Sequence, residues 1–157
     1  MSNQQETLTV QQALDRAARL YDAGRLPEAA DIYQQVLRDW PDQHIALTML
    51  GFIALQVGKH DIALDQLSKA VEIKTDTADA HHNLAIALNA LGRTQDAVTS
   101  YRRALAINPE RAETHNNLGL TLCRLGNVRE GIAEYRKTLA INSEFFDAPV
   151  NLGVALC

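Results

Sequence analysis

The sequence is poor in the residues that several fold classes require. Aromatic residues account for only 5% of its 157 residues, and this scarcity disfavours a β-sandwich or β-barrel. The two cysteines, Cys123 and Cys157, are too few for a disulfide framework. No apolar run approaches the ~18 residues of a membrane span, and the N-terminal segment MSNQQETLTV lacks the cationic-then-apolar order of a signal peptide. We therefore expect a helical, cytoplasmic protein that makes no membrane contact.

Basic residues are in the minority as well. Lysine and arginine number 15 against 19 aspartate and glutamate residues, which gives a net charge of −4 and a pI near 5.7. A surface that follows phosphates needs the opposite balance, so nucleic acid is not an expected partner.

Internal repetition is what the sequence has in abundance. Four columns of residues recur with a step of 34 and stay in phase without an insertion. The columns are Gly24, Gly58, Gly92 and Gly126; Leu50, Leu84, Leu118 and Leu152; Ala29, Ala63, Ala97 and Gly131; and Tyr33, Leu67, Tyr101 and Tyr135.

Each repeat contains two amphipathic helical patterns. In the second repeat the apolar spacing predicts helices over 44–57 and 61–73, with Gly58 ending the first in a left-handed conformation. Small residues such as Gly51 and Ala63 indicate positions where two helices approach closely. Gly131 replaces alanine inside a predicted helix, at a cost of about 1 kcal/mol relative to Ala.

This pattern resembles the tetratricopeptide repeat. The resemblance implies an all-α fold, a right-handed α-solenoid of helix–turn–helix units. We expect a poorly ordered segment 1–9 followed by repeats 10–43, 44–77, 78–111 and 112–145, with a truncated fifth repeat over 146–157.

The truncated repeat suggests two hypotheses. Its first helix has no partner helix, so an apolar side formed by Val150, Val154 and Leu156 would face water and favour self-association, giving a possible homodimer. We also expect the chain to be the N-terminal part of a longer polypeptide.

The sequence contains none of the motifs that would indicate a catalytic site. There is no glycine-rich phosphate loop, no zinc-protease motif and no nucleophile motif, so we expect no catalytic residues and no cofactor. His81 and His115 share a column, but successive repeats lie ~10 Å apart, too far for two ligands of one metal ion. We interpret them as histidines packed at a helix interface.

The predicted concave surface is the more informative feature. An asparagine column, Asn83, Asn117 and Asn151, stands one residue before the packing leucines. An amide both donates and accepts, and three extended residues at ~3.3 Å each span the distance between successive first helices. The column could therefore hold a peptide backbone, or it could only bridge neighbouring helices. The remaining predicted groove residues are Phe52, His82, Ile86, Asn89, Asn116 and Leu120.

The stretches HHNLAIALNALGR and HNNLGLTLCRLGN resemble repeats of the O-linked N-acetylglucosamine transferase type. That resemblance implies that Asn83, Asn117 and Asn151 hold an acceptor peptide. Three functions stay open: a non-catalytic module that binds an extended polypeptide, the substrate-docking arm of a glycosyltransferase-type enzyme, and a scaffold that self-assembles through its open C-terminal end.

Overall fold

The computed structural model describes residues 9–145, 150, 151 and 153. This part of the chain forms eight α-helices and contains no strand. In chain order they are α1 (Val10–Asp22), α2 (Leu26–Asp39), α3 (His44–Gln56), α4 (His60–Ile73), α5 (Ala78–Ala90), α6 (Thr94–Ile107), α7 (Ala112–Arg124) and α8 (Val128–Ile141). The predicted all-α fold is confirmed. Within the described residues, no helix combines the length and the apolarity needed to span a membrane.

The same turn joins the two helices of every pair. Gly24, Gly58, Gly92 and Gly126 have φ between 73° and 82°, a left-handed conformation that glycine adopts without steric cost. The residue after each glycine donates its backbone N–H to the carbonyl five positions earlier, as Lys59 does to Ala54 at 2.8 Å. This pattern is a Schellman motif, which satisfies carbonyls that the helix end would otherwise leave unpaired.

The first helix begins with a local capping signal. The Thr9 side chain accepts from the Gln12 backbone, and the Gln12 side chain accepts from the Thr9 backbone N–H at 2.9 Å. Pro27 lies in the first turn of α2, where its missing N–H leaves no hydrogen bond unmade.

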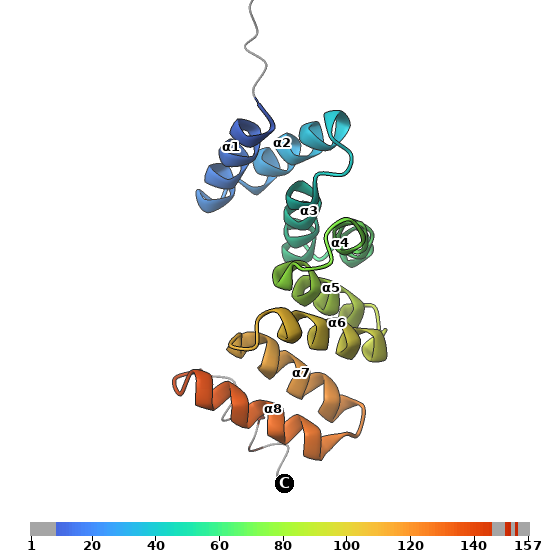
Figure 1. Cartoon of the computed structure of the whole chain (residues 1–157), viewed down its shortest axis with the longest axis vertical. Coiled ribbons are helices and arrows are strands. Elements are labelled where there is room, and N and C mark those ends of the chain that lie inside the picture. The colour runs from blue at the N-terminus through green and yellow to red at the C-terminus, as the bar shows by residue number, and fades with distance from the viewer. Residues whose placement is uncertain (1–8, 146–149, 152, 154–157) are drawn as a thin grey trace, which may run out of the picture.

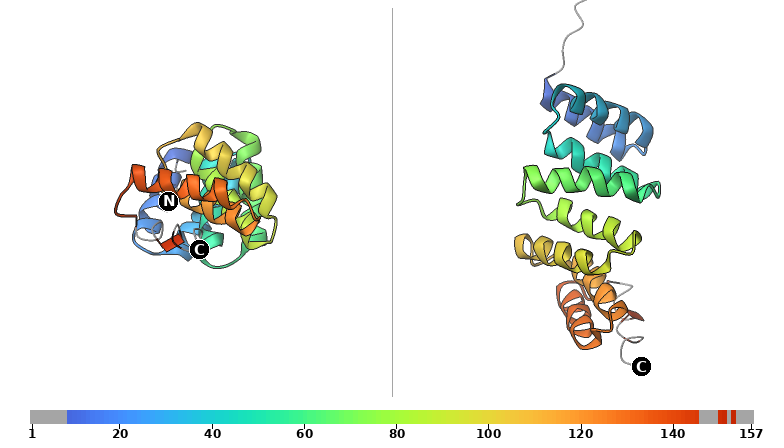
Figure 2. Two further views of the ribbon diagram at one scale, coloured as in Figure 1. Left: turned by 90° about the horizontal axis from the view of Figure 1, so that it is seen from below. Right: turned by 90° about the vertical axis from the view of Figure 1, so that its right-hand side faces the viewer.

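The helix pairs stack along one axis to form an α-solenoid. Figure 1 shows α1 and α2 at one end of the long axis and α7 and α8 at the other. The right-hand view of Figure 2 shows the helices as successive layers. From α3 onward, each first helix packs against both its own second helix and the second helix of the preceding pair.

The predicted packing columns form the core. Tyr33, Leu67, Tyr101 and Tyr135 are each at most 2% exposed, and Ala29, Ala63 and Ala97 are fully buried. The large residue of one column therefore fills the interior while the small residue of the other allows the two helices to approach.

Gly131 has a packing role that the sequence analysis did not anticipate. A Cβ added there would lie 2.4 Å from Cys123 Sγ and 2.8 Å from the carbonyl oxygen of Gly119. The backbones of α7 and α8 are thus too close for alanine at this position. Its glycine is required by a close approach, which corrects the view that it only weakens the helix.

Candidate functional site: the concave groove

The first helices of three repeats enclose a cavity of about 480 Å³ at the N-terminal half of the groove. Side chains from α1, α3 and α5 line it, together with Tyr33 of α2 and Arg111, which precedes α7. The lining residues are Gln11, Leu14, Asp15, Ala18, Tyr21, Asp22, Tyr33, Ile45, Thr48, Met49, Phe52, Asp79, Asn83 and Arg111. A volume of this size lies within the ~300–1,000 Å³ of ligand-binding pockets.

Aromatic and aliphatic side chains form the apolar part of the cavity. The rings of Tyr21 and Phe52 lie 5.8 Å apart between centroids and are tilted by 43°. Gln56 donates its side-chain N–H to the Tyr21 hydroxyl at 2.7 Å, which fixes the ring against α3. Phe52 is therefore in the groove, where the sequence placed it.

Charged groups gather beside this apolar surface. Arg111 forms ion pairs with Asp79 and, at 3.5 Å, with Glu113. The pKa of Glu113 is lowered to about 2, mainly by its interaction with His82 and further by Arg111. This carboxylate is therefore ionised at neutral pH.

His82 lies in the interior and not on the groove surface, which corrects its predicted placement. It is 1% exposed, and its ring packs edge-on against Tyr101 at 5.7 Å between centroids. Its Nδ1 pairs with Thr114 Oγ1 at 2.8 Å, and its Nε2 lies 3.6 Å from Glu113. His82 thus links α5 to α7.

Two further predicted groove amides also link neighbouring repeats. Asn89 donates to Thr121 Oγ1 at 2.7 Å, across the same α5–α7 interface. Asn116 is 5% exposed and accepts from the Asn151 side chain at 3.0 Å. Each of these amides thus makes one hydrogen bond within the protein, while Asn89 Oδ1 is buried without a partner among the described residues.

The three members of the asparagine column have different surroundings. Asn83 lines the cavity, whereas Asn151 bonds Asn116 as described. Asn117 is partly buried and lies near the Tyr101 hydroxyl. Burial raises the pKa of Tyr101 to about 12, and the amides of Asn89 and Asn117 act in the opposite direction.

The predicted apolar positions of the C-terminal half contribute less open surface. Ile86 is partly buried against the central core, and Leu120 is partly buried too. Neither lines the N-terminal cavity. Val150, predicted for self-association, is 58% exposed, while Val154 and Leu156 lie outside the described residues.

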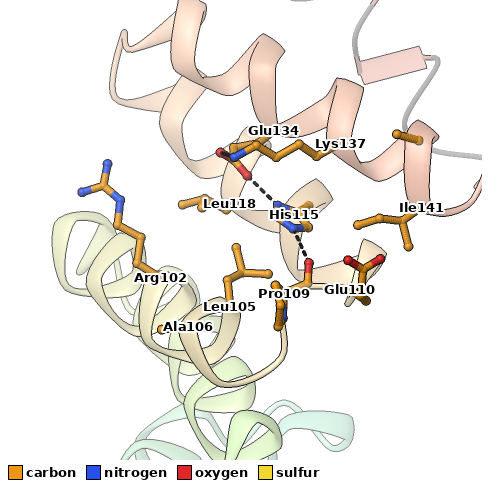
Figure 3. Close-up of a pocket in the computed structure, with 11 residues that line it drawn as sticks. Arg102, Leu105, Ala106, Pro109, Glu110, His115, Leu118, Glu134, Lys137 and Ile141 are labelled. Carbon is orange, nitrogen blue, oxygen red and sulfur yellow. Dashed lines mark hydrogen bonds and ion pairs between the residues drawn. The ribbon is translucent and has the colours of Figure 1, made fainter.

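A second depression lies on the side of the second helices, between α6 and α8 (Figure 3). It has a volume of about 660 Å³ and an apolar floor that includes Leu105 and Leu118. Three of its charged residues are paired within the protein: Arg102 with Glu130 at 2.5 Å, and Lys137 with Glu134 at 2.8 Å.

His115 closes the base of this depression. Its Nδ1 lies 2.6 Å from Glu134 and its Nε2 lies 2.9 Å from the Pro109 carbonyl oxygen. His115 thus connects α7 to α8 and to the turn that precedes α7. His81 makes the equivalent contact to the Thr75 carbonyl, and the described residues contain no group of side chains that could hold a metal ion.

The sequence analysis missed the contribution of the first repeat to the groove. Asp15, Tyr21 and Asp22 line the cavity, whereas all the predicted groove residues lie in later repeats. The period of 34 offered a signal, because Asp15 stands 34 positions before Met49, which also lines the cavity. No comparable pattern in the sequence indicated that Arg111 would line the cavity.

The chain matches known repeat families. A family model described as tetratricopeptide repeat matches residues 14–80, and one described as TPR repeat matches residues 87–126. No curated protein matches the chain in sequence. Together with the paired helices, these matches identify the chain as a tetratricopeptide repeat protein.

Solved structures share the fold over most of their length. A crystal structure of MamA is 28% identical with a TM-score of 0.82, covering 88% of this chain and 81% of its own. A second MamA structure is 27% identical with a TM-score of 0.84, covering 93% and 80%. YrrB, described as a TPR protein with an unusual peptide-binding site, is 20% identical with a TM-score of 0.83, covering 94% and 76%; at this identity the likeness shows the fold alone.

Proposed function

We propose that this chain is a non-catalytic protein–protein interaction module that binds an extended polypeptide in its concave groove. The observation that carries the proposal is the cavity that α1, α3 and α5 enclose together, with an apolar wall and polar groups beside it. Solenoid repeats use such extended concave surfaces to bind partners. A cytoplasmic location and an extended-polypeptide partner stay predictions.

The asparagine column supplies a mechanism for this binding. Asn83 and Asn117 stand one repeat apart, and three extended residues of a peptide span about the same ~10 Å. An amide that donates and accepts can pair with a peptide backbone whatever its side chains are. In our proposal Asn83 and Asn117 hold the backbone, while Asn151 positions Asn116.

The test is selection from a displayed library of random peptides. Groove-dependent peptides are those enriched on the wild-type protein and not on Thr48→Arg, which places a large cation in the cavity. For such peptides, replacing Asn83 and Asn117 by Ala weakens binding about tenfold, because each lost hydrogen bond is worth ~0.5–1.5 kcal/mol. Fluorescence anisotropy measures the affinity, and thermal melting checks that the variant stays folded.

The matched control is Asn127→Ala, which alters an exposed asparagine in the turn before α8. Its affinity should equal that of the wild type. Unchanged affinity of the Asn83/Asn117 double variant would show that the column does not hold the peptide.

The exposure of Val150 favours a second candidate, self-association through the C-terminal segment. Sedimentation velocity of the 157-residue chain should then show a concentration-dependent dimer that Val150→Lys weakens. A wild-type chain that sediments as a monomer at high concentration would contradict this candidate.

A further inference from the structure

We propose that the N-terminal half of the groove selects polypeptides in which a large apolar residue is flanked by lysine or arginine. The inference rests on the proposed function and names the class of ligand that this part of the groove takes. Three independent features of the cavity carry it: its apolar wall, two carboxylates without an ion pair among the described residues, and an accessible amide without a hydrogen bond.

The apolar wall provides the seat for one large side chain. Met49 and Phe52 from α3 and Tyr21 from α1 surround the open volume of about 480 Å³. The hydrogen bond from Gln56 holds Tyr21 in place before any ligand arrives, so little side-chain freedom is lost on binding.

Carboxylates stand directly beside this wall. Asp15 and Asp22 line the cavity from α1, and in the part of the chain that the structure describes neither forms an ion pair. Asp79 is different, because Arg111 neutralises it from across the cavity. The cavity therefore carries a net negative charge that comes from α1, and its complement is a cationic side chain.

Asn83 supplies the third feature. Asn83 lines the cavity, and among the described residues its side-chain amide makes no hydrogen bond and is not one of the buried polar atoms that lack a partner. The amide is therefore accessible from the cavity, where a peptide group can both donate to it and accept from it. In the C-terminal half, Asn116 and Asn151 bond each other, and the side-chain N–H of Asn89 is bonded to Thr121.

The geometry also fixes the length of the probe. Three first helices at ~10 Å spacing lie ~20 Å apart from first to last, which about seven extended residues at ~3.3 Å per step can span. We therefore use three labelled peptides of that length with Gly-Ser flanks, whose central residues are Lys-Leu-Lys, Glu-Leu-Glu and Lys-Ser-Lys. Fluorescence anisotropy should give an affinity for Lys-Leu-Lys at least about tenfold higher than for either of the others, which lose the charge or the apolar contact.

Two variants assign the preference to the cavity. Asp15→Asn with Asp22→Asn should weaken Lys-Leu-Lys binding about three- to tenfold and reduce its dependence on salt. Asp31→Asn, which removes an exposed carboxylate of α2 outside the cavity, is the matched control and should leave the affinity unchanged.

Each outcome bears on one proposal in particular. Equal affinities for Lys-Leu-Lys and Glu-Leu-Glu, or equal losses in the Asp15/Asp22 and Asp31 variants, would overturn the basic–apolar preference. If none of the three peptides binds while the random library yields groove-dependent peptides, the preference is wrong and the proposed function stands. If the library also yields none, both are wrong.

Discussion

At the residue scale, the contact between Glu113 and His82 in the α5–α7 interface makes one contribution to stability depend on pH. Glu113 has a pKa lowered from 4.5 to about 2, because His82 and Arg111 stabilise its ionised form. A carboxyl group whose pKa is lower in the folded state stabilises the fold above its ordinary pKa. That contribution is lost as the pH falls from 4.5 toward about 2.

We therefore expect Glu113→Gln to make the pH dependence shallower. The free energy of unfolding of the wild type should fall more steeply between pH 4.5 and pH 2 than that of the variant. Urea unfolding at a series of pH values measures both slopes. Glu72→Gln, which removes an exposed carboxylate of α4 that forms no ion pair among the described residues, should keep the wild-type slope. Parallel profiles for Glu113→Gln and wild type would contradict the assignment.

Residue-scale contacts were the least predictable part of the site. The helical spacing placed His82 on the groove stripe beside Asn83, but Thr114 and Tyr101 enclose it. Whether a stripe residue faces solvent depends on the next repeat, and Thr114 lies 32 positions away. A pattern read along one helix carries no information about that neighbour.

At the element scale, the close approach of α7 and α8 makes a prediction opposite to helix propensity. Alanine in place of Gly131 gains about 1 kcal/mol of propensity. It also introduces contacts to Cys123 and to the Gly119 backbone below 3.0 Å. Overpacking of this kind costs ~1–3 kcal/mol, and a backbone oxygen cannot move aside as a side chain can. Gly131→Ala should therefore lower the free energy of unfolding, as measured by urea denaturation.

A double variant separates the two contacts. Adding Cys123→Ala removes the sulfur but not the Gly119 carbonyl, so it should recover only part of the stability lost in Gly131→Ala. A Gly131→Ala chain as stable as the wild type would show that α7 and α8 can separate at little cost.

The alanine column, to which Ala97 belongs, tests the cost of overpacking at a position where the native residue is alanine. Ala97 is fully buried in the central core, between α5 and α6. Ala97→Leu should destabilise the chain by ~1–3 kcal/mol in urea unfolding. Ala106→Leu, on the exposed face of α6, should be within about 0.5 kcal/mol of the wild type. A neutral Ala97→Leu would place the column outside the core.

The sequence predicted the helices and turns better than it predicted side-chain contacts. The repeat of 34 residues gave the helices, their turns and the buried columns, since each rests on local backbone preference and on a period. The packing role of Gly131 was not predicted, because the distance between α7 and α8 depends on side chains of both helices, including the sulfur of Cys123.

At the scale of the whole molecule, the solenoid shape determines which residues share a site. Arg111 lines the same cavity as Asp15, although Asp15 belongs to the first repeat and Arg111 stands at the end of the third. This meeting depends on the curvature of the superhelix, which a repeat of fixed length does not specify. The sequence therefore located the groove but not the half of it in which apolar, acidic and amide groups converge.

The same one-dimensional stacking limits how far a local change spreads. Each repeat contacts only its neighbours, so a lost contact should weaken the adjoining repeats and leave distant ones unaffected. Thr114→Val keeps the shape of the side chain and removes the partner of His82 Nδ1, leaving a buried polar atom unpaired. We expect a loss of ~1–3 kcal/mol in urea unfolding.

Hydrogen exchange then locates the effect along the chain. Protection should fall in α5 and α7, which the His82–Thr114 contact joins, while α1 and α2 keep their wild-type rates. Thr99→Val is the matched control, because its exposed hydroxyl bonds only the Gln95 carbonyl of its own helix. Equal loss of protection in α1 and α5 would mean that the repeats unfold as one cooperative unit. A groove that selects ligands near α1 would then be sensitive to substitutions at the far end of the molecule.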